Sequence, residues 1–237
     1  MKGILPVTKP LGKTSFYVVA CIRRLFSEKT VGHAGTLDPF ATGVMIILIG
    51  KAFTRQSNQF LNQDKEYVTR LLLGKSTDTY DLDGQITATS DYVPTLSEIE
   101  AKLQLFQGTI EQTPPMFSAK KVNGKKLYEL ARQGKTIERK PCVINVQTEL
   151  LSYAYPYLDL KVTCSKGTYI RSIAHDLGLL LSSYAHLTEL KRTRSGQFSL
   201  DCCLDLEKLL SINFSESFFS VDEQGIIHTC DSLLCTY

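Results

Sequence analysis

Gly32-His33-Ala34-Gly35-Thr36-Leu37-Asp38-Pro39 is followed, after four residues, by the unbroken apolar run Val44-Met45-Ile46-Ile47-Leu48-Ile49. A run of this length is far too short to span a bilayer, and it indicates a buried strand. The glycines of the preceding loop let the backbone approach a ligand closely. Asp38 is the one carboxylate of this loop, but Asp before Pro is also common turn chemistry. The residues alone therefore leave open whether Asp38 shapes a turn or serves a site.

A helix is expected before this loop, and strands are expected after it. Apolar residues at positions 18, 19, 22, 25 and 26 follow the helical period behind Ser15, which we expect to cap the helix. Tyr67–Leu73 and Gln85–Thr89 are predicted to be paired strands, joined by the polar loop Thr77–Gly84.

The rest of the chain mixes helix and strand signals without strict alternation. Ser97 and Glu100 form a capping-box pattern before a helix, and a second helix is predicted from Thr168. Residues 157–164 alternate like a strand with one buried face, and residues 189–198 also favour a strand. These patterns predict the α+β class with a mostly antiparallel central sheet.

Charge is unevenly distributed along the 237 residues. Residues 201–237 carry seven acids and one lysine, so the net charge of +3 for the whole chain leaves +9 on residues 1–200. Ala119–Pro141 alone holds eight Lys or Arg residues against two Glu residues. This segment would suit a polyanionic partner, but composition alone favours a solvated charged surface.

Several other classes of function have no support in the sequence. The seven cysteines include no C-x-x-C pair, which is typical of a protein in a reducing cytoplasm. The four histidines lack metal-ligand spacing, and no G-x-S-x-G motif accompanies a serine. Gly12-Lys13-Thr14 resembles the end of a P-loop, but Val7 stands where its first glycine is required. No N-terminal targeting segment or membrane span is predicted.

Arg171 is unusual because it falls in the first turn of the helix predicted from Thr168. A positive charge there opposes the helix dipole, and a carboxylate partner would explain it. An exposed arginine that tolerates a penalty of a few tenths of a kcal/mol is the alternative.

An ordered set of motifs resembles the TruB family of tRNA pseudouridine synthases over roughly residues 3–210. The motifs are KPLGKTS (9–15), VGHAGTLDPFATG (31–43), KEY (65–67), LG (73–74), TDT (77–79), QTPPMFSAK (112–120), LY (127–128), AR (131–132), SKGTYIR (165–171) and LKRT (190–193). The resemblance implies a pseudouridine synthase fold with a curved, mostly antiparallel sheet, flanking helices and a central cleft. It implies no cofactor and no metal.

The resemblance also implies a division of the chain. Residues 1–200 would be the catalytic domain, with residues 112–141 as an RNA-binding insertion. Residues 201–237 would be a short acidic tail, too short and too acidic for a complete PUA RNA-binding domain. The expected partner is the T arm of tRNA, bound by a cytoplasmic monomer without a guide RNA.

Site residues follow from the same resemblance. Asp38 would be the catalytic carboxylate, Tyr67 would stack on the target base, and Arg171 would pair with Asp38. Substrate binding is assigned to His33, Leu190, Lys9, Lys120, Arg132, Lys166 and Tyr169.

The chemistry explains why so few residues are needed. The uridine at tRNA position 55 loses its N1 glycosidic bond, turns over and rejoins the sugar through C5, which one ionised carboxylate in a water-poor pocket can promote. A guanidinium keeps that carboxylate charged, and an aromatic face offsets the cost of flipping the base. Whether Asp38 attacks uracil C6 or the sugar C1′ stays open. Two other hypotheses are a non-catalytic RNA-binding module and a synthase that acts on another RNA, including a guide-dependent relative.

Overall fold

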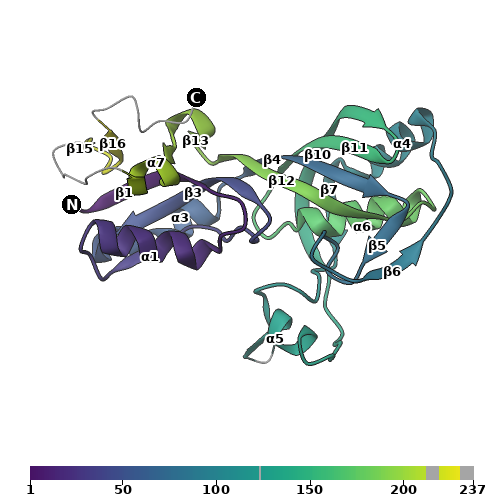
Figure 1. Ribbon diagram of the computed structural model, residues 1–237, viewed down its shortest axis with the longest axis horizontal. Helices are drawn as coiled ribbons and strands as arrows, with labels where there is room; N and C mark the ends of the chain where they lie inside the picture. Colours follow the sequence, from purple (N-terminus) through teal and green to yellow (C-terminus); the bar gives the residue numbers. More distant parts are fainter. Residues whose placement is uncertain (123, 212–218, 230–237) are drawn as a thin grey trace. The chain divides into compact units, whose positions relative to one another are not determined.

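The computed structural model describes residues 1–122, 124–211 and 219–229, which form two compact units (Figure 1). The first unit comprises Met1–Tyr67 and Leu190–Tyr237, and the second comprises Val68–Glu189. Two strands, β4 (Lys65–Leu73) and β12 (Ala185–Ser195), contribute residues to both units.

The first unit is a sheet with the strand order β14-β1-β3-β12. β1 and β2 are antiparallel to β3, whereas β14 is parallel to β1 and β12 is parallel to β3. Its elements are β1 (Gly3–Lys9), α1 (Ser15–Leu25), β2 (Val31–His33), β3 (Thr42–Ile49), α2 (Lys51–Thr54), α3 (Ser57–Leu61), β13 (Phe198–Ser199), the 3-10 turn η2 (Leu200–Cys202), β14 (Leu204–Asp205), α7 (Leu206–Ser211), β15 (Phe219–Val221) and β16 (Ile227–Thr229).

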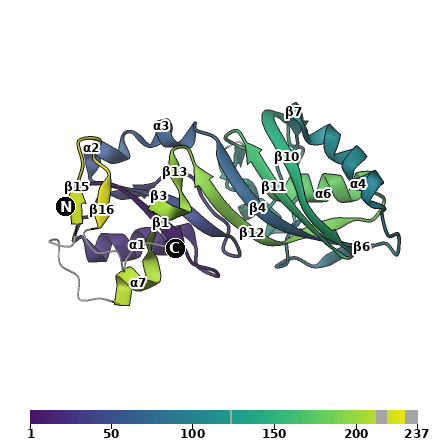
Figure 2. The ribbon, with the colours of Figure 1, turned by 90° about the horizontal axis from the view of Figure 1, so that it is seen from above.

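The apolar run of β3 is buried on both faces, as its composition predicts. Met45 and Ile47 pack in one cluster with Ile22 of α1, while Ile46 packs in another with Phe60 of α3. Figure 2 shows α1 and α3 on opposite sides of this sheet. The buried strand predicted from residues 44–49 is therefore confirmed.

The acidic segment 201–237 contributes to this core as far as it is described. Apolar residues from α7, β14, β15 and β16 join the cluster beneath α1, namely Leu204, Leu206, Leu209, Phe219 and Ile227. Residues 212–218 and 230–237 of the predicted tail lie outside the described part of the chain, as do Cys230 and Cys235. The predicted boundary at residue 200 stays a prediction.

The second unit is a sheet with the order β12-β4-β11-β10-β7, with α4 contacting both α6 and β10. Its remaining elements are β5 (Lys75–Thr77), β6 (Ile86–Thr89), α4 (Leu96–Leu103), the 3-10 turn η1 (Gln104–Phe106), β7 (Gly108–Gln112), β8 (Lys121–Val122), β9 (Lys125–Lys126), α5 (Leu127–Ala131), β10 (Cys142–Ala154), β11 (Tyr157–Cys164) and α6 (Ile170–Leu180). The α+β class with a mostly antiparallel sheet is confirmed, with parallel pairs in the first unit.

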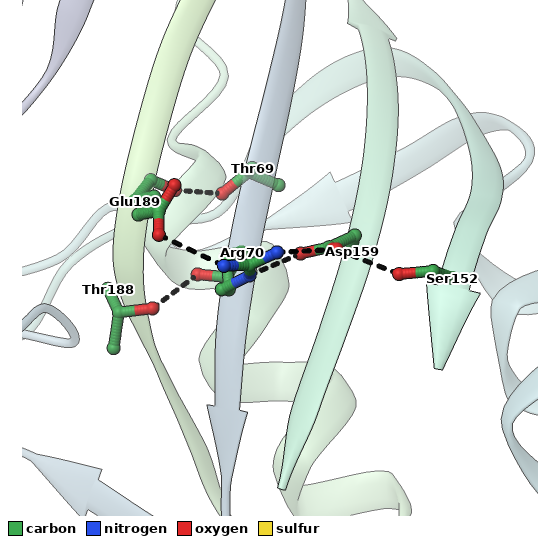
Figure 3. A network of polar contacts seen from close by, with 6 residues as sticks. All are labelled: Thr69, Arg70, Ser152, Asp159, Thr188 and Glu189. Carbon is green, nitrogen blue, oxygen red and sulfur yellow. Dashed lines mark hydrogen bonds and ion pairs between the residues drawn. The ribbon is translucent and has the colours of Figure 1, made fainter. Parts of the chain in front are cut away.

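A polar network ties four strands of the second unit together (Figure 3). Arg70 of β4 makes a bidentate contact with Asp159 of β11, at 2.7 and 2.9 Å, and reaches Glu189 of β12 at 3.2 Å. Ser152 of β10 donates to Asp159 at 2.8 Å. Such bidentate contacts between an arginine and a carboxylate fix the geometry of neighbouring strands.

Three local predictions were wrong. The cap of α1 is Thr14, whose hydroxyl accepts from the amide of Tyr17. The capping box of α4 is formed by Thr95 and Glu98, not by Ser97 and Glu100. Residues 86–89 pair with β5 and not with residues 67–73, because Gly74, at φ +90°, ends β4 and turns the chain before β5 begins.

Candidate active site

The loop that carries Asp38 is fixed on both sides of the carboxylate by the segment around the start of α1. The hydroxyl of Ser15 accepts from the amide of Leu37 at 2.9 Å and donates to the carbonyl of Leu37 at 3.0 Å. On the other side, the amide of Gly12 donates to the carbonyl of Pro39 at 2.9 Å. The half-buried Asp38 is therefore presented by a backbone that is held immediately before and after it.

Lys9 lies beneath this loop with no solvent exposure. Its amine donates to the carbonyls of Pro10, Lys13 and Pro39, at 2.9, 2.6 and 3.1 Å. Burial lowers the pKa of the Lys9 amine to about 8, although the nearby charge of Asp38 raises it. The structure thus gives Lys9 a part in holding the loop, and its predicted contact with RNA stays a prediction.

Arg192 of β12 is a second buried cation that contacts the same loop, and it was not predicted as a site residue. The side chain is 1% exposed, and its Nε donates to the carbonyl of Val44 at 2.7 Å and its Nη2 to that of Gly35 at 3.2 Å. Gly43 has a φ of +104°, and a Cβ there would overlap the backbone carbonyl of Arg192. The close approach of β3 and β12 therefore requires glycine at this position. The signal in the sequence was the LKRT motif, which contains Arg192.

His33 is half-buried at the end of β2, opposite Ile47 of β3. Burial, and then the charge of Arg192, lower the pKa of His33 below its ordinary value. A lowered pKa favours the neutral imidazole, which can form hydrogen bonds through both ring nitrogens and can stack on another ring.

Leu190 and Tyr67 are both buried in the first unit, Leu190 midway along β12 and Tyr67 near the start of β4. Lys191 of β12 pairs with Thr42 of β3, four residues after Asp38. In the same unit, Thr193 of β12 donates to Glu66, the neighbour of Tyr67, at 2.7 Å. The strands β3, β12 and β4 are neighbours in the sheet. The loop that carries Asp38 leads into β3, and Leu190 and Tyr67 lie on β12 and β4.

Arg171 belongs to the second unit, where it is buried and anchored by three partners. Its guanidinium donates to the carbonyls of Thr79, at 2.9 Å, and Phe117, at 2.7 Å, and it lies 3.4 Å from a carboxylate oxygen of Asp81. Arg171 therefore has a carboxylate partner, as its place at the start of α6 indicated, and that partner is Asp81 within its own unit. The pairing of Arg171 with Asp38, which lies in the other unit, stays a prediction.

Asp81 was not predicted as a site residue. One of its oxygens accepts from the hydroxyl of Thr79 at 2.6 Å and from the amide of Asp83 at 3.1 Å. Residues 77–84 thereby form a loop that is organised around a buried carboxylate and closed onto Arg171. The TDT motif, two residues before Asp81, was the available signal.

The insertion begins at a firm anchor on α6. Gln112 exchanges two hydrogen bonds with the backbone of Tyr169, at 3.1 and 2.8 Å, and Ser172 donates to the carbonyl of Thr113 at 3.1 Å. Tyr169 is half-buried, and Lys166, in the loop before α6, is exposed. Lys166 is therefore accessible to an anionic ligand.

The basic segment 119–141 leaves the sheet of the second unit as a loop that carries α5 (Figure 1). Lys120 donates to the sulfur of Cys142 at 2.8 Å. The exposed guanidinium of Arg132 and the amine of Lys126 lie 5.4 and 5.3 Å from the ring centroid of Tyr128. The segment thus combines structural lysines with an aromatic ring flanked by cations.

The described part of the chain holds no cluster of metal ligands. Its five cysteines are free thiols, and no group of three or more His, Cys, Asp or Glu side chains within it could hold a metal ion. None of the described helices is long and apolar enough to cross a membrane.

Comparison with known proteins gives the same family throughout. The TruB family pseudouridylate synthase N-terminal domain matches residues 23–170, and the tRNA pseudouridylate synthase B C-terminal domain matches residues 171–234. Proteins named tRNA pseudouridine synthase B from Protochlamydia amoebophila and Chlamydia trachomatis serovar L2 are 58% and 53% identical. The alignments cover 86% and 96% of this chain, and 78% and 94% of theirs.

Solved structures give the same fold. A Cbf5-Nop10-Gar1 complex contains a chain that matches with a TM-score of 0.69 at 31% identity, over 88% of this chain. An H/ACA RNP bound to a substrate RNA matches with a TM-score of 0.68 at 28% identity, over 96% of this chain. The matched regions span 53% and 59% of those longer chains. With a matching sequence, fold and set of motifs, this chain belongs to the TruB family of pseudouridylate synthases.

Proposed function

We propose that this protein isomerises the uridine at position 55, in the T arm of tRNA, to pseudouridine, with Asp38 as the catalytic carboxylate. The observation that carries the proposal is the presentation of Asp38 by a loop that is held at Leu37 and Pro39 and lies over the buried cations Lys9 and Arg192. The names of its relatives support tRNA as the substrate.

The reaction needs a carboxylate and an environment that keeps it charged. The bond between uracil N1 and C1′ breaks, the base turns over and C5 bonds to C1′. The proton on C5 leaves to water, and N1 takes up a proton from water, so that the product is an isomer of uridine. A cation near a carboxylate favours its ionised form, which is the nucleophile. The neighbouring Lys9 supplies such a charge from the same unit, and Arg171 would supply another if it pairs with Asp38.

Substrate binding would be divided between the two units. In the first unit, Tyr67 would stack on the flipped base, and Leu190 and neutral His33 would bound its pocket. In the second unit, Lys166, Tyr169 and the insertion with Lys120 and Arg132 would contact the T arm. Aromatic stacking offsets the cost of removing a base from its helix, and basic side chains bind its phosphates.

Asp38→Asn separates catalysis from binding, because it preserves the size of the side chain and removes its charge. With tRNA that carries tritium at uridine C5, the wild-type protein should release label to water without added metal or nucleotide. The variant should bind tRNA with similar affinity and release none. Release from the variant at a rate near that of the wild type would exclude Asp38 from the mechanism, and tRNA binding by the wild type without release would favour a non-catalytic RNA-binding module.

The second candidate is a synthase that acts within a complex of protein and RNA, because a similar chain belongs to an H/ACA RNP bound to a substrate RNA. We propose that this protein needs no guide RNA and acts as a monomer in the cytoplasm. The free thiols among the described residues suit a reducing compartment. Purified protein should modify an isolated T-arm hairpin and sediment as a single chain. A requirement for an added RNA or partner protein would favour the second candidate.

A further inference from the structure

The exposed side of α1 and the loop before it combine apolar and basic side chains. Leu11, Phe16 and Tyr17 are 68%, 67% and 38% exposed, and Lys13 and Arg24 are exposed beside them. We call these five residues the α1 surface. Large apolar side chains gathered with cations on one surface are typical of an interaction site, whereas single exposed apolar residues need no explanation.

The aromatic rings and cations of this surface lie together. The amine of Lys13 lies 5.0 Å from the ring centroid of Tyr17, and the guanidinium of Arg23, at the edge of the α1 surface, lies 5.8 Å from that of Phe16. Arg23 is itself fixed, because it donates to the carbonyl of Val31 at 2.9 Å. These distances are within the range of cation–π attraction. An aromatic ring flanked by cations suits a ligand that offers flat rings and negative charge in alternation.

The α1 surface is continuous with the backbone that holds Asp38. Leu11 and Lys13 are the neighbours of Gly12, whose amide donates to the carbonyl of Pro39. Phe16 follows Ser15, whose hydroxyl binds Leu37. The N-terminal part of this surface therefore lies beside the backbone that presents Asp38.

We propose that the α1 surface binds the unpaired nucleotides of the RNA that flank the target uridine. Their bases would stack on Phe16 and Tyr17, and their phosphates would contact Lys13 and Arg24. Unpaired nucleotides are the suitable class because their ring faces are free to stack, whereas paired bases keep theirs covered. This inference rests on the proposed function, since it takes the target uridine to be the one that reaches Asp38.

Stacking and phosphate binding predict different changes, so the two parts of the surface can be tested separately. With an isolated T-arm hairpin, Phe16→Ala and Tyr17→Ala should each weaken binding by about 5-fold to 150-fold and leave the salt dependence unchanged. Phe16→Trp should retain wild-type affinity. Lys13→Gln and Arg24→Gln should each lower the slope of log affinity against log salt by about 0.7, the value for one single-strand phosphate contact.

The control is Leu179→Ala combined with Leu180→Ala, which removes two exposed apolar side chains from α6 and should leave hairpin affinity unchanged. Unchanged hairpin affinity in both the Phe16→Ala and Tyr17→Ala variants would overturn the proposal. Weaker binding of whole tRNA but not of the hairpin would also overturn it, because the surface would then bind nucleotides outside the T arm. Tritium release by the wild type, measured in parallel, shows separately whether the proposed function holds.

Discussion

The hydroxyl of Ser15 both accepts a hydrogen bond from the amide of Leu37 and donates one to its carbonyl, at 2.9 and 3.0 Å. One side chain at the start of α1 therefore satisfies both backbone groups of the residue before Asp38. The sequence pattern indicated Ser15 as a helix cap, but Thr14 has that role and leaves Ser15 free for the loop.

Ser15→Ala should lower turnover and leave tRNA affinity nearly unchanged. The buried amide and carbonyl of Leu37 would lose their partner, which costs about 1–3 kcal/mol of unfolding free energy and loosens the position of Asp38. Single-turnover rates and urea unfolding measure the two effects. Thr14→Ala is the matched control, since loss of the helix cap costs about 1 kcal/mol without touching Leu37. Equal losses of turnover in both variants would contradict a specific role for Ser15.

The ionisation of Lys9 should affect turnover and the free energy of unfolding in opposite directions as pH rises. Its pKa is lowered from 10.5 to about 8 by burial, so above about pH 8 the folded chain loses a proton that the unfolded chain keeps. Because the unfolded chain then binds more protons, the contribution of Lys9 to the unfolding free energy should rise between about pH 8 and 10.5. The neutral amine has only two N–H donors for three carbonyls, so turnover should fall by about 2-fold to 10-fold over the same range.

Lys9→Met supplies the comparison for both measurements. The variant should turn over more slowly at neutral pH and should lack this ionisation in its pH–rate profile. Urea unfolding at pH 7.5 and 9.5 should show the wild type gaining stability relative to the variant. If the wild type instead loses relative stability as pH rises, the charge of Asp38 outweighs burial and the pKa of Lys9 is raised in the folded chain, which would contradict this prediction.

The sequence predicted those parts of the fold and site that depend on local patterns. The apolar run of β3, the apolar stripe of α1 and the alternation along β11 are patterns of neighbouring residues. Each of these elements forms as predicted. Asp38 lies in a loop before the apolar strand, as predicted, but the first residues of the predicted loop form the strand β2, which was not predicted. These elements depend on residues close together in the chain, and for that reason they could be predicted from the sequence alone.

The contacts that organise the site depend on residues far apart in the chain. Arg171 forms an ion pair with Asp81, 90 positions earlier in the sequence, and Arg192 donates to the carbonyl of Gly35, 157 positions earlier. No local period encodes such pairs, so Arg192 was recognised only as part of a motif, and Asp81, outside the motifs, was not singled out. Lys9 shows the same limit, because nothing near it in the sequence indicates that three carbonyls surround its amine.

Asp81→Asn should impair catalysis through Arg171. The substitution leaves a buried guanidinium beside a neutral amide, and breaking a buried pair costs about 3–5 kcal/mol, less if water enters. A small displacement of Arg171 should lower turnover by about 100-fold if it serves the reaction. Arg171→Lys keeps the charge but cannot reach Thr79, Phe117 and Asp81 together, so its turnover should fall similarly. Full turnover of either variant, measured by tritium release, would show that this pair is structural only.

The basic segment should bind phosphates chiefly through its exposed lysines. Lys120 and Lys126 are engaged with Cys142 and Tyr128, whereas Lys121 and Lys125 are exposed on β8 and β9. Lys121→Glu combined with Lys125→Glu should therefore weaken tRNA binding and flatten its salt dependence, by about 0.7 to 0.9 of a slope unit for each phosphate that is no longer bound. Filter binding between low and physiological salt measures that slope. Lys75→Glu, at an exposed position of β5 in the same unit, makes the same type of substitution with half the change of charge, and it should leave the slope as it is. An unchanged slope in the double variant would mean that the RNA backbone is bound elsewhere.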